Sequence, residues 1–137
     1  MSASGAELQP ELWVDDVAAA VEFYGRALRA VVEHRVGEPD DPEGVAQLSV
    51  AGVSFWVSDS SRRLGRFSPG MIGDGTGRVL LVIEDPEALL DAAVAAGASK
   101  TNPVADEHGW RLGRFVDPFG HEWEVGHPVG AWPPGSR

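Results

Sequence analysis

The chain contains an internal repeat, and this repeat constrains its fold more than any other feature. Residues 12–16 (LWVDD) align with residues 81–85 (LVIED), and residues 52–57 (GVSFWV) align with residues 120–125 (GHEWEV). A helical pattern follows the first member of each pair, and strand-like runs surround it. Because a self-similar sequence is the mark of a repeated structural unit, the chain is predicted to be an α+β protein made of two βαβββ modules.

Helices and strands are predicted from caps and from hydrophobic spacing. Asp15 or Asp16 can cap a first helix, whose apolar residues recur at three- and four-residue steps between residues 17 and 28. A second helix begins at Pro86, a favoured first position, and ends at Gly97. The predicted strands are 8–15, 31–38, 45–50, 53–58, 78–83, 110–116 and 121–126, with a further one at 98–104 that Pro103 interrupts.

The 137 residues, 43% of them hydrophobic, are enough for one domain with its own core. We predict a single domain over residues 1–137, with module one at about 8–59 and module two at about 78–127. The linker 60–77 is rich in glycine and lacks periodicity, which predicts a flexible crossing between the modules. A tail, 128–137, follows. Whether the modules pair within one chain or between two chains stays open, because the linker length permits both.

The two-residue period of a strand assigns side chains to opposite faces of each sheet. One face is apolar and suits packing under the two helices: Leu12, Val14, Val53, Phe55, Val57, Val79, Leu81, Ile83, Trp123 and Val125. The other face is mixed: Gln9, Glu11, Trp13, Ser54, Trp56, Ser58, Arg78, Leu80, Val82, Glu122 and Glu124. If the sheet curves, with the helices on its outer face, this second face lines a concave pocket suited to a small molecule.

Charge and composition exclude several classes of function. Acidic residues outnumber basic ones 21 to 11, for a formal charge of −10, which argues against binding nucleic acid or an anionic membrane surface. The chain has no cysteine, so disulfides and thiol nucleophiles are absent. No stretch resembles a signal peptide or an apolar span, so a cytoplasmic location is expected.

The segment RFVDPFGHEWEV, residues 114–125, is close to a zinc-protease motif but does not match it. That motif needs a helix and a second histidine where Val125 stands. On a strand, His121 and His127 point away from the neighbouring glutamates, and residues 117–120 (DPFG) have turn chemistry. The chain also lacks a GxSxG elbow, a P-loop and a dinucleotide fingerprint. No nucleotide cofactor is therefore expected.

Several of these segments resemble one known superfamily. VDDVAAAVEFYGRAL after the first strand, the paired βαβββ modules and the closing FVDPFGHEWEV are similar to the vicinal oxygen chelate superfamily, which includes glyoxalase I, extradiol dioxygenases and bleomycin resistance proteins. SPGMIGDGTG and RLGRFVDPFGHEW are most similar to its PhnB-like, bleomycin-resistance-type members. The resemblance implies a curved sheet around a pocket and a homodimer. It does not fix the activity, because that superfamily hosts several chemistries and pure binders.

The resemblance also places the metal site of the superfamily on four positions of this chain. They are Gln9 and its repeat mate Arg78, and Trp56 and its repeat mate Glu124. Gln9 and Glu124 carry suitable oxygen ligands, whereas the indole of Trp56 and the guanidinium of Arg78 carry none. We therefore predict that no metal binds there and that an ion pair between Arg78 and Glu124 takes its place.

Without a metal, the mixed face offers stacking surfaces and one cation. Indoles suit planar aromatic compounds, and an arginine can stack or hold an acidic group. The predicted ligand-binding residues are Gln9, Trp13, Trp56, Arg78, Trp110 and Glu124. The sequence favours a metal-independent, homodimeric binding protein that sequesters an aromatic or planar compound such as an antibiotic. The alternatives are a metal-dependent lyase, isomerase or dioxygenase of the same superfamily, and a structural or regulatory dimer with a vestigial pocket.

Each residue also has a plainer interpretation. Trp13 and Trp56 suit a core or a dimer interface, Arg78 and Glu124 a structural ion pair, and Gln9 a satisfied core amide. The remaining candidates lie in loops and in the tail: His108, exposed or an acid–base catalyst; Arg62, Arg63 and Arg66, a solvated loop face; and Trp132, packed on a partner or disordered.

Overall fold

The structure is a computed structural model that describes residues 5–37 and 44–135. Module one contains β1 (Glu11–Val14), α1 (Val17–Leu28), β2 (Val31–Val36), β3 (Val45–Val50) and β4 (Val53–Asp59). Module two contains β5 (Arg78–Val82), α3 (Pro86–Ala95), β6 (Ser99–Glu107), β7 (Trp110–Val116) and β8 (Glu122–Pro128). A short helix, α2 (Pro69–Ile72), lies in the linker. The predicted α+β fold with two βαβββ modules is confirmed.

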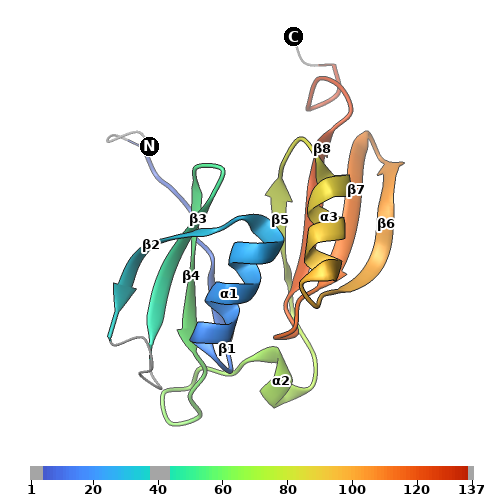
Figure 1. Cartoon of the computed structure of the whole chain (residues 1–137). Helices are drawn as coiled ribbons and strands as arrows, with labels where there is room; N and C mark the ends of the chain where they lie inside the picture. Colours follow the sequence, from blue (N-terminus) through green and yellow to red (C-terminus); the bar gives the residue numbers. More distant parts are fainter. Residues whose placement is uncertain (1–4, 38–43, 136–137) are drawn as a thin grey trace.

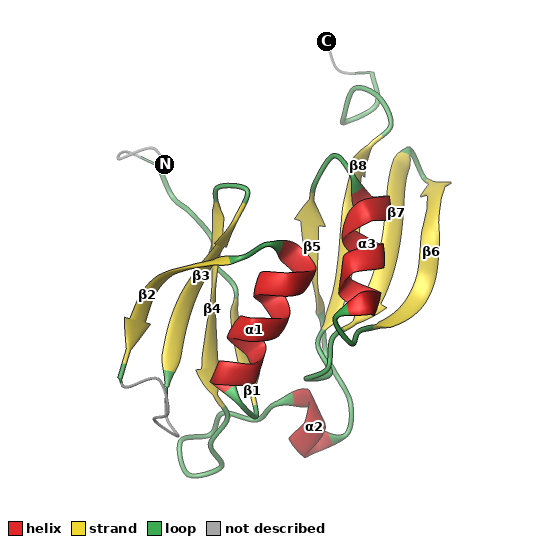
Figure 2. Ribbon diagram, viewed as in Figure 1, coloured by secondary structure: helices red, strands yellow, loops and turns green. Residues whose placement is uncertain are grey.

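The two modules have the same sheet topology. Their strand orders are β1-β4-β3-β2 and β5-β8-β7-β6, and in each sheet the first strand runs parallel to the last one while the other pairs are antiparallel. The chain therefore forms two four-stranded sheets rather than one continuous sheet. Figures 1 and 2 show α1 and α3 next to each other, each covering its own sheet on the same side of the molecule.

Both long helices begin where the sequence predicts them. The Asp16 side chain accepts a hydrogen bond from the Ala19 amide at 3.1 Å, and the Asp85 side chain accepts one from the Ala88 amide at 3.1 Å. Such caps satisfy amide groups that have no partner within the helix. The equivalent starts confirm that the two modules repeat a local signal as well as a topology.

The hydrophobic core lies between the helices and the sheets and is shared by the two modules. Tyr24 of α1 is fully buried, and its ring centroid lies 5.3 Å from that of Phe55 and 5.6 Å from that of Trp123 in module two. The Tyr24 hydroxyl donates to the Asp117 carboxylate, which also accepts from the Trp123 indole at 2.9 Å. Since these contacts join the two halves, the modules of this chain pair with each other.

Four sequence expectations change in the structure. Val53 was predicted to be buried but is 57% exposed, because it follows the β3–β4 turn at the end of the sheet. β1 begins at Glu11, so Gln9 precedes the strand, and the linker contains α2 instead of being wholly irregular. β6 is longer than predicted and includes Pro103, which is tolerated because β6 is an edge strand. Residue 38, the end of the predicted strand 31–38, lies outside the described residues.

Within residues 5–37 and 44–135, no helix has the length and apolar character needed to cross a membrane.

Candidate functional site

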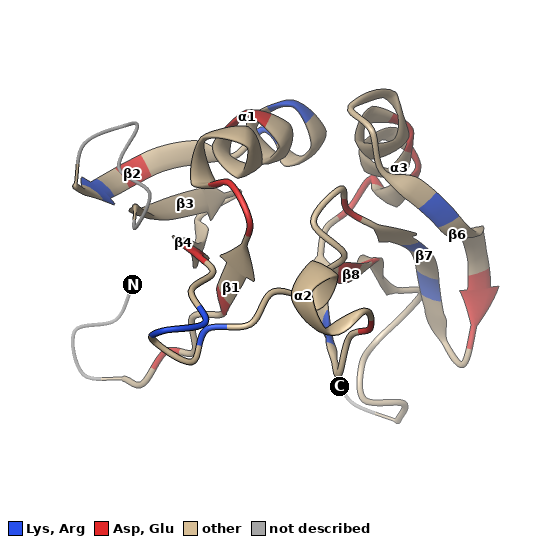
Figure 3. Cartoon of the chain, turned by 90° about the horizontal axis from the view of Figure 1, so that it is seen from below, with Lys and Arg blue, Asp and Glu red and all other residues tan. Residues whose placement is uncertain are grey.

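The polar face of each sheet lies opposite the helices, as the two-residue period predicts. Figure 3 shows both long helices on one side of the sheets, with the linker and α2 crossing near the junction of the modules. Leu12, Phe55 and Trp123 point into the core, whereas their neighbours Trp13 and Trp56 are only half-buried. The alternative that these two tryptophans belong to the hydrophobic core is therefore wrong.

In module one, hydrogen bonds centred on Gln9 organise the polar face. The Gln9 side-chain oxygen accepts from the Trp56 indole at 2.7 Å and from the Gln47 amide at 3.1 Å. The Gln9 amide nitrogen donates to Glu7 at 2.6 Å. Gln9 is thus satisfied, but it is exposed and does not belong to the core. We call Gln9, Gln47 and Trp56 the amide–indole cluster.

In module two, ion pairs occupy the equivalent place. Glu124 is 8% exposed, and its carboxylate lies 2.7 Å from Nε of Arg114 and 3.7 Å from Nη2 of Arg78. Arg114 also bonds Glu107 at 2.6 Å, and Arg78 bonds Glu122 at 3.0 Å. The hydrogen bond from Arg114 lowers the pKa of Glu107. We call Arg78, Arg114, Glu107, Glu122 and Glu124 the ion-pair ladder.

The three residues of the amide–indole cluster have counterparts in three residues of the ion-pair ladder. Gln47 lies opposite Trp56 in the β3–β4 pair, and Arg114 lies opposite Glu124 in the β7–β8 pair. The predicted Arg78–Glu124 ion pair is present, but Glu122 is the closer partner of Arg78. The sequence interpretation missed Arg114. The alternation along β7 would have placed its side chain on the polar face.

The residues at the four positions of the superfamily's metal site do not fit a divalent cation. Trp56 and Arg78 have no ligand atom, and the oxygen of Gln9 already accepts two hydrogen bonds. The carboxylate of Glu124 lies between two guanidinium groups, whose positive charge opposes a cation at the same place. Among the residues that the structure describes, no three or more His, Asp or Glu side chains group as metal ligands.

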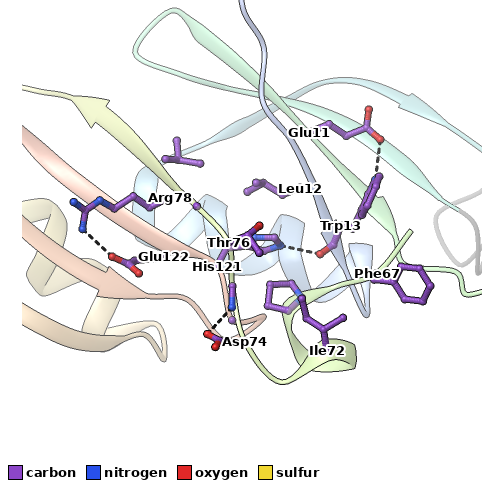
Figure 4. A pocket seen from close by; sticks show the side chains of 15 residues that line it. Glu11, Leu12, Trp13, Phe67, Ile72, Asp74, Thr76, Arg78, His121 and Glu122 are labelled. Atoms are coloured by element: carbon purple, nitrogen blue, oxygen red, sulfur yellow. Dashed lines mark hydrogen bonds and ion pairs between the residues drawn. The ribbon is translucent and has the colours of Figure 1, made fainter. Parts of the chain in front are cut away.

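A cavity of about 340 Å³ lies where the two modules meet the linker. Figure 4 shows Glu11, Trp13, Phe67 and Ile72 along one side of it and Arg78 with Glu122 on the other. The remaining lining residues come from β1, the linker, β5 and the turn before β8: Leu12, Pro69, Asp74, Gly75, Thr76, Gly77, Val79, Gly120 and His121. A volume near the low end of the range of ligand sites, about 300–1,000 Å³, suits a small molecule.

The linker is fixed over the cavity by specific contacts. The Asp15 carboxylate accepts from the Ser60 and Ser68 hydroxyls at 2.9 and 2.5 Å. Gly120 has a φ of +90°, and a Cβ atom there would lie 2.8 Å from the Pro69 side chain, so glycine lets the turn before β8 approach α2 closely. A second depression, of about 500 Å³, shares Asp74 and Glu122 with this cavity and extends to Phe119.

His121 connects the two modules at the floor of the cavity. Its Nε2 atom lies 2.8 Å from the carbonyl oxygen of Trp13 (Figure 4). His121 precedes β8, so the alternating directions of side chains along that strand do not apply to it. Its side chain lines the same cavity as Glu122. The sequence interpretation placed these two side chains on opposite faces and did not identify His121 as a lining residue.

The six predicted ligand residues divide among four places. Trp13 and Arg78 line the cavity, Gln9 and Trp56 form the amide–indole cluster, and Glu124 lies in the ion-pair ladder. The sixth, Trp110, packs at a ring-centroid distance of 5.5 Å against Trp132, so the tail folds back on its own chain. His108 is exposed in the turn between β6 and β7, as the solvent-facing interpretation predicts. The roles of Gln9, Trp56, Trp110 and Glu124 in binding stay predictions.

The cavity residues that sequence reasoning missed come mainly from the linker. Phe67, Ile72 and Asp74 have no periodic pattern around them, so only their packing in three dimensions identifies them as lining residues. Glu11 was placed on the correct face but was not singled out. Its alternation with Leu12 was the available signal.

Comparison with known proteins agrees with this architecture. The model of a family described as "Glyoxalase-like domain" matches residues 11–126. An uncharacterized protein of Mycobacterium tuberculosis is 35% identical over 126 residues, covering 89% of this chain and 74% of that protein. The crystal structure of an Arabidopsis thaliana gene product is 30% identical, with a TM-score of 0.67 and coverage of 90% and 99% of the two chains.

A more distant structural neighbour is the fosfomycin resistance protein FosX from Listeria monocytogenes, solved with Mn(II) and a sulfate ion. It is 15% identical, with a TM-score of 0.68 and coverage of 96% of each chain. At this identity the likeness shows the fold alone. The repeated topology, the position of the cavity and the match over residues 11–126 lead to one conclusion: the chain belongs to the glyoxalase-like domain family, within the vicinal oxygen chelate superfamily.

Proposed function

We propose that this chain is a metal-independent binding protein that sequesters a small aromatic or planar molecule such as an antibiotic. The observation that carries the proposal is which residues stand at the four positions of the superfamily's metal site and what their side chains contact. Two have lost their ligand atoms, and the oxygens of Gln9 and Glu124 are engaged by protein donors. A metal would have to displace these partners and overcome the charge of two arginines.

The cavity under the linker supports the binding half of the proposal. Trp13 and Phe67 give it aromatic surface, and its apolar residues are accompanied by a few charged groups, which is the usual make-up of a small-molecule site. The fosfomycin resistance protein FosX shares the fold, so this scaffold is compatible with a role in resistance.

Metal content and ligand binding test the two halves separately. After dialysis against manganese, nickel, zinc or ferrous iron, mass spectrometry should find no ion retained in proportion to the protein. Titration with a panel of planar aromatic compounds, in the presence of a chelator, should quench tryptophan emission with saturation. A retained ion that Glu124→Ala releases would favour the alternative of a metal-dependent lyase, isomerase or dioxygenase.

Two tryptophan variants locate the binding. Trp13→Ala should abolish saturable binding measured by calorimetry, because Trp13 lines the cavity. Trp132→Ala is the matched control, since that indole lies in the tail against Trp110. Equal binding by both variants would show that the ligand does not bind in this cavity.

We propose further that the protein acts as a homodimer. Leu80 and Val82 on β5 are 44% and 57% exposed on the face opposite the helices, and a partner would remove this apolar surface from water. Sedimentation at micromolar concentration should give twice the chain mass, and a monomer alone would contradict the proposal. The cytoplasmic location stays a prediction from the sequence.

A further inference from the structure

We propose that the cavity under the linker selects a planar aromatic cation. This inference rests on the proposed binding function and adds the charge of the ligand. It depends on the charge balance of the lining, on the aromatic wall and on the size of the cavity. The family resemblance predicts none of these features.

The basic groups of the cavity are already engaged. Arg78 lies 3.0 Å from Glu122 and 3.7 Å from Glu124, so its charge is balanced within the ion-pair ladder. The His121 ring donates through Nε2 to the Trp13 carbonyl, which leaves that nitrogen unavailable to a ligand. Besides its pair with Glu124, the sequence analysis gave Arg78 a second role, in which it stacks on a ligand or holds an acidic group. This geometry argues against the hold on an acidic group.

Two acidic groups of the cavity have no oppositely charged partner among the described residues. The Glu11 carboxylate accepts from the Trp13 indole at 3.2 Å and from the Ser58 hydroxyl at 3.1 Å, and both donors are neutral. The Asp74 carboxylate accepts from the Gly75 amide at 2.8 Å. Within the described part of the chain, neither carboxylate forms an ion pair. The cavity therefore attracts a positive charge.

The aromatic wall lies beside one of these carboxylates. Figure 4 shows the Trp13 ring between Glu11 and Phe67, with the Glu11 carboxylate at its indole nitrogen. A carboxylate that accepts from the indole N–H increases the electron density of the ring, and an electron-rich face attracts a cation more strongly. Arg62 already lies 5.8 Å from the centroid of the Phe67 ring, so one cation–π contact exists at the edge of this wall.

The dimensions limit the ligand to a small ring system. A cavity of about 340 Å³ holds two fused rings with a small substituent. A ring stacked on Trp13 with its positive charge near Glu11 and Asp74 would satisfy both the aromatic and the charged part of the lining. A neutral ring would use only the first of these, and an anion would be repelled by the second.

Three probes with one ring system and different charges test the proposal. They are N-methylquinolinium, quinoline and quinoline-4-carboxylate, which at neutral pH are cationic, neutral and anionic. Isothermal titration calorimetry on the full chain in chelator should give N-methylquinolinium about tenfold tighter binding than quinoline, with the carboxylate weakest. Added salt should weaken the binding of the cation and leave that of quinoline unchanged.

Charge-neutralising variants assign the preference to the cavity. Glu11→Gln and Asp74→Asn should each lower the preference for the cation several-fold, whereas Asp91→Asn should leave it intact. Asp91 is exposed on α3 and does not line the cavity, and its substitution changes the net charge by the same amount. Thermal unfolding of each variant shows that the fold is kept.

The outcomes separate this inference from the proposed function. Equal affinity for all three probes, or tighter binding of the carboxylate, would overturn the charge selectivity while aromatic binding stands. No saturable heat with any of them would overturn both. A preference for the cation that persists in Glu11→Gln and in Asp74→Asn would assign it to another part of the molecule and remove the cavity from the inference.

Discussion

The polar faces of the two modules have the same backbone and different chemistry. In module one, Gln47 and Trp56 lie on paired strands and converge on Gln9 through neutral hydrogen bonds. In module two, Arg114 and Glu124 occupy the paired positions, and Arg78 takes the place of Gln9. The repeat in the sequence preserved the strand order, the caps and the core positions, but not these side chains.

This difference shows what the repeated unit needs in order to fold. Residues such as Val57 and Val125 are fully buried at equivalent positions, so the core constrains them in both modules. The polar face carries no such constraint as long as every buried group has a partner. Either neutral hydrogen bonds or ion pairs satisfy that condition, and the two solutions respond differently to mutation, pH and salt.

The largest expected effect comes from removing the central acceptor of the ion-pair ladder. Glu124→Ala leaves Arg114 with a single ion pair in a half-buried place, which should lower the free energy of unfolding by about 2–3 kcal/mol. In module one, Trp56→Phe removes the N–H donor to Gln9 and part of a half-buried ring, and should cost about 1 kcal/mol. Urea unfolding of both variants measures the difference. Equal losses would mean that the two clusters contribute alike despite their chemistry.

A second prediction concerns the contact that joins the modules. Tyr24→Phe removes the hydrogen bond to the buried Asp117 carboxylate and should cost about 1.5 kcal/mol at neutral pH. Burial and the negative charge of Asp117 raise the pKa of Tyr24 well above its usual 10.0. The protonated phenol therefore stabilises the folded state below the unfolded pKa, and this contribution is lost as the pH rises through the folded pKa.

The free energy of unfolding, measured as the pH rises above neutrality, tests this contribution of Tyr24. Wild-type stability should fall above the usual pKa of tyrosine, and the Tyr24→Phe variant should lack that part of the fall. Parallel profiles for the two proteins would contradict the assignment to Tyr24. If Tyr24→Phe also makes the two modules unfold in separate steps, the hydrogen bond between Tyr24 and Asp117 is what makes them unfold together.

The sequence predicted the fold well because the fold depends on short-range signals. Asp16 and Asp85 cap their helices as expected, and the alternation of Leu12 with Trp13 places them on opposite faces. Val53 shows the limit of this reasoning, since alternation gives the face of a side chain but not whether another layer covers it.

The site was predicted only in part, because it is built from contacts distant in sequence. Trp13 and Arg78 were identified from strand alternation and from the resemblance. Phe67 and Asp74 belong to a linker without periodicity, and their place at the cavity depends on how Asp15 and Gly120 fix the linker. Ion pairing was also predicted only in part. The sequence analysis predicted the pair of Arg78 with Glu124. It missed the closer pair of Arg78 with Glu122 and the contact of Arg114 with Glu124.

The smallest expected effect separates the two modules by their response to acid. The hydrogen bond from Arg114 lowers the pKa of Glu107 below its usual 4.5, so the ion pair stabilises the fold above the usual pKa and its contribution is lost as the pH falls through the lowered value. The urea concentration at the midpoint of unfolding should therefore fall less at acid pH in Glu107→Gln than in the wild type. Glu33→Gln in module one is the matched control, because its side chain accepts from the neutral Ser49 hydroxyl. A fall reduced equally in both variants would show that sensitivity to acid does not distinguish the ion-pair ladder from module one.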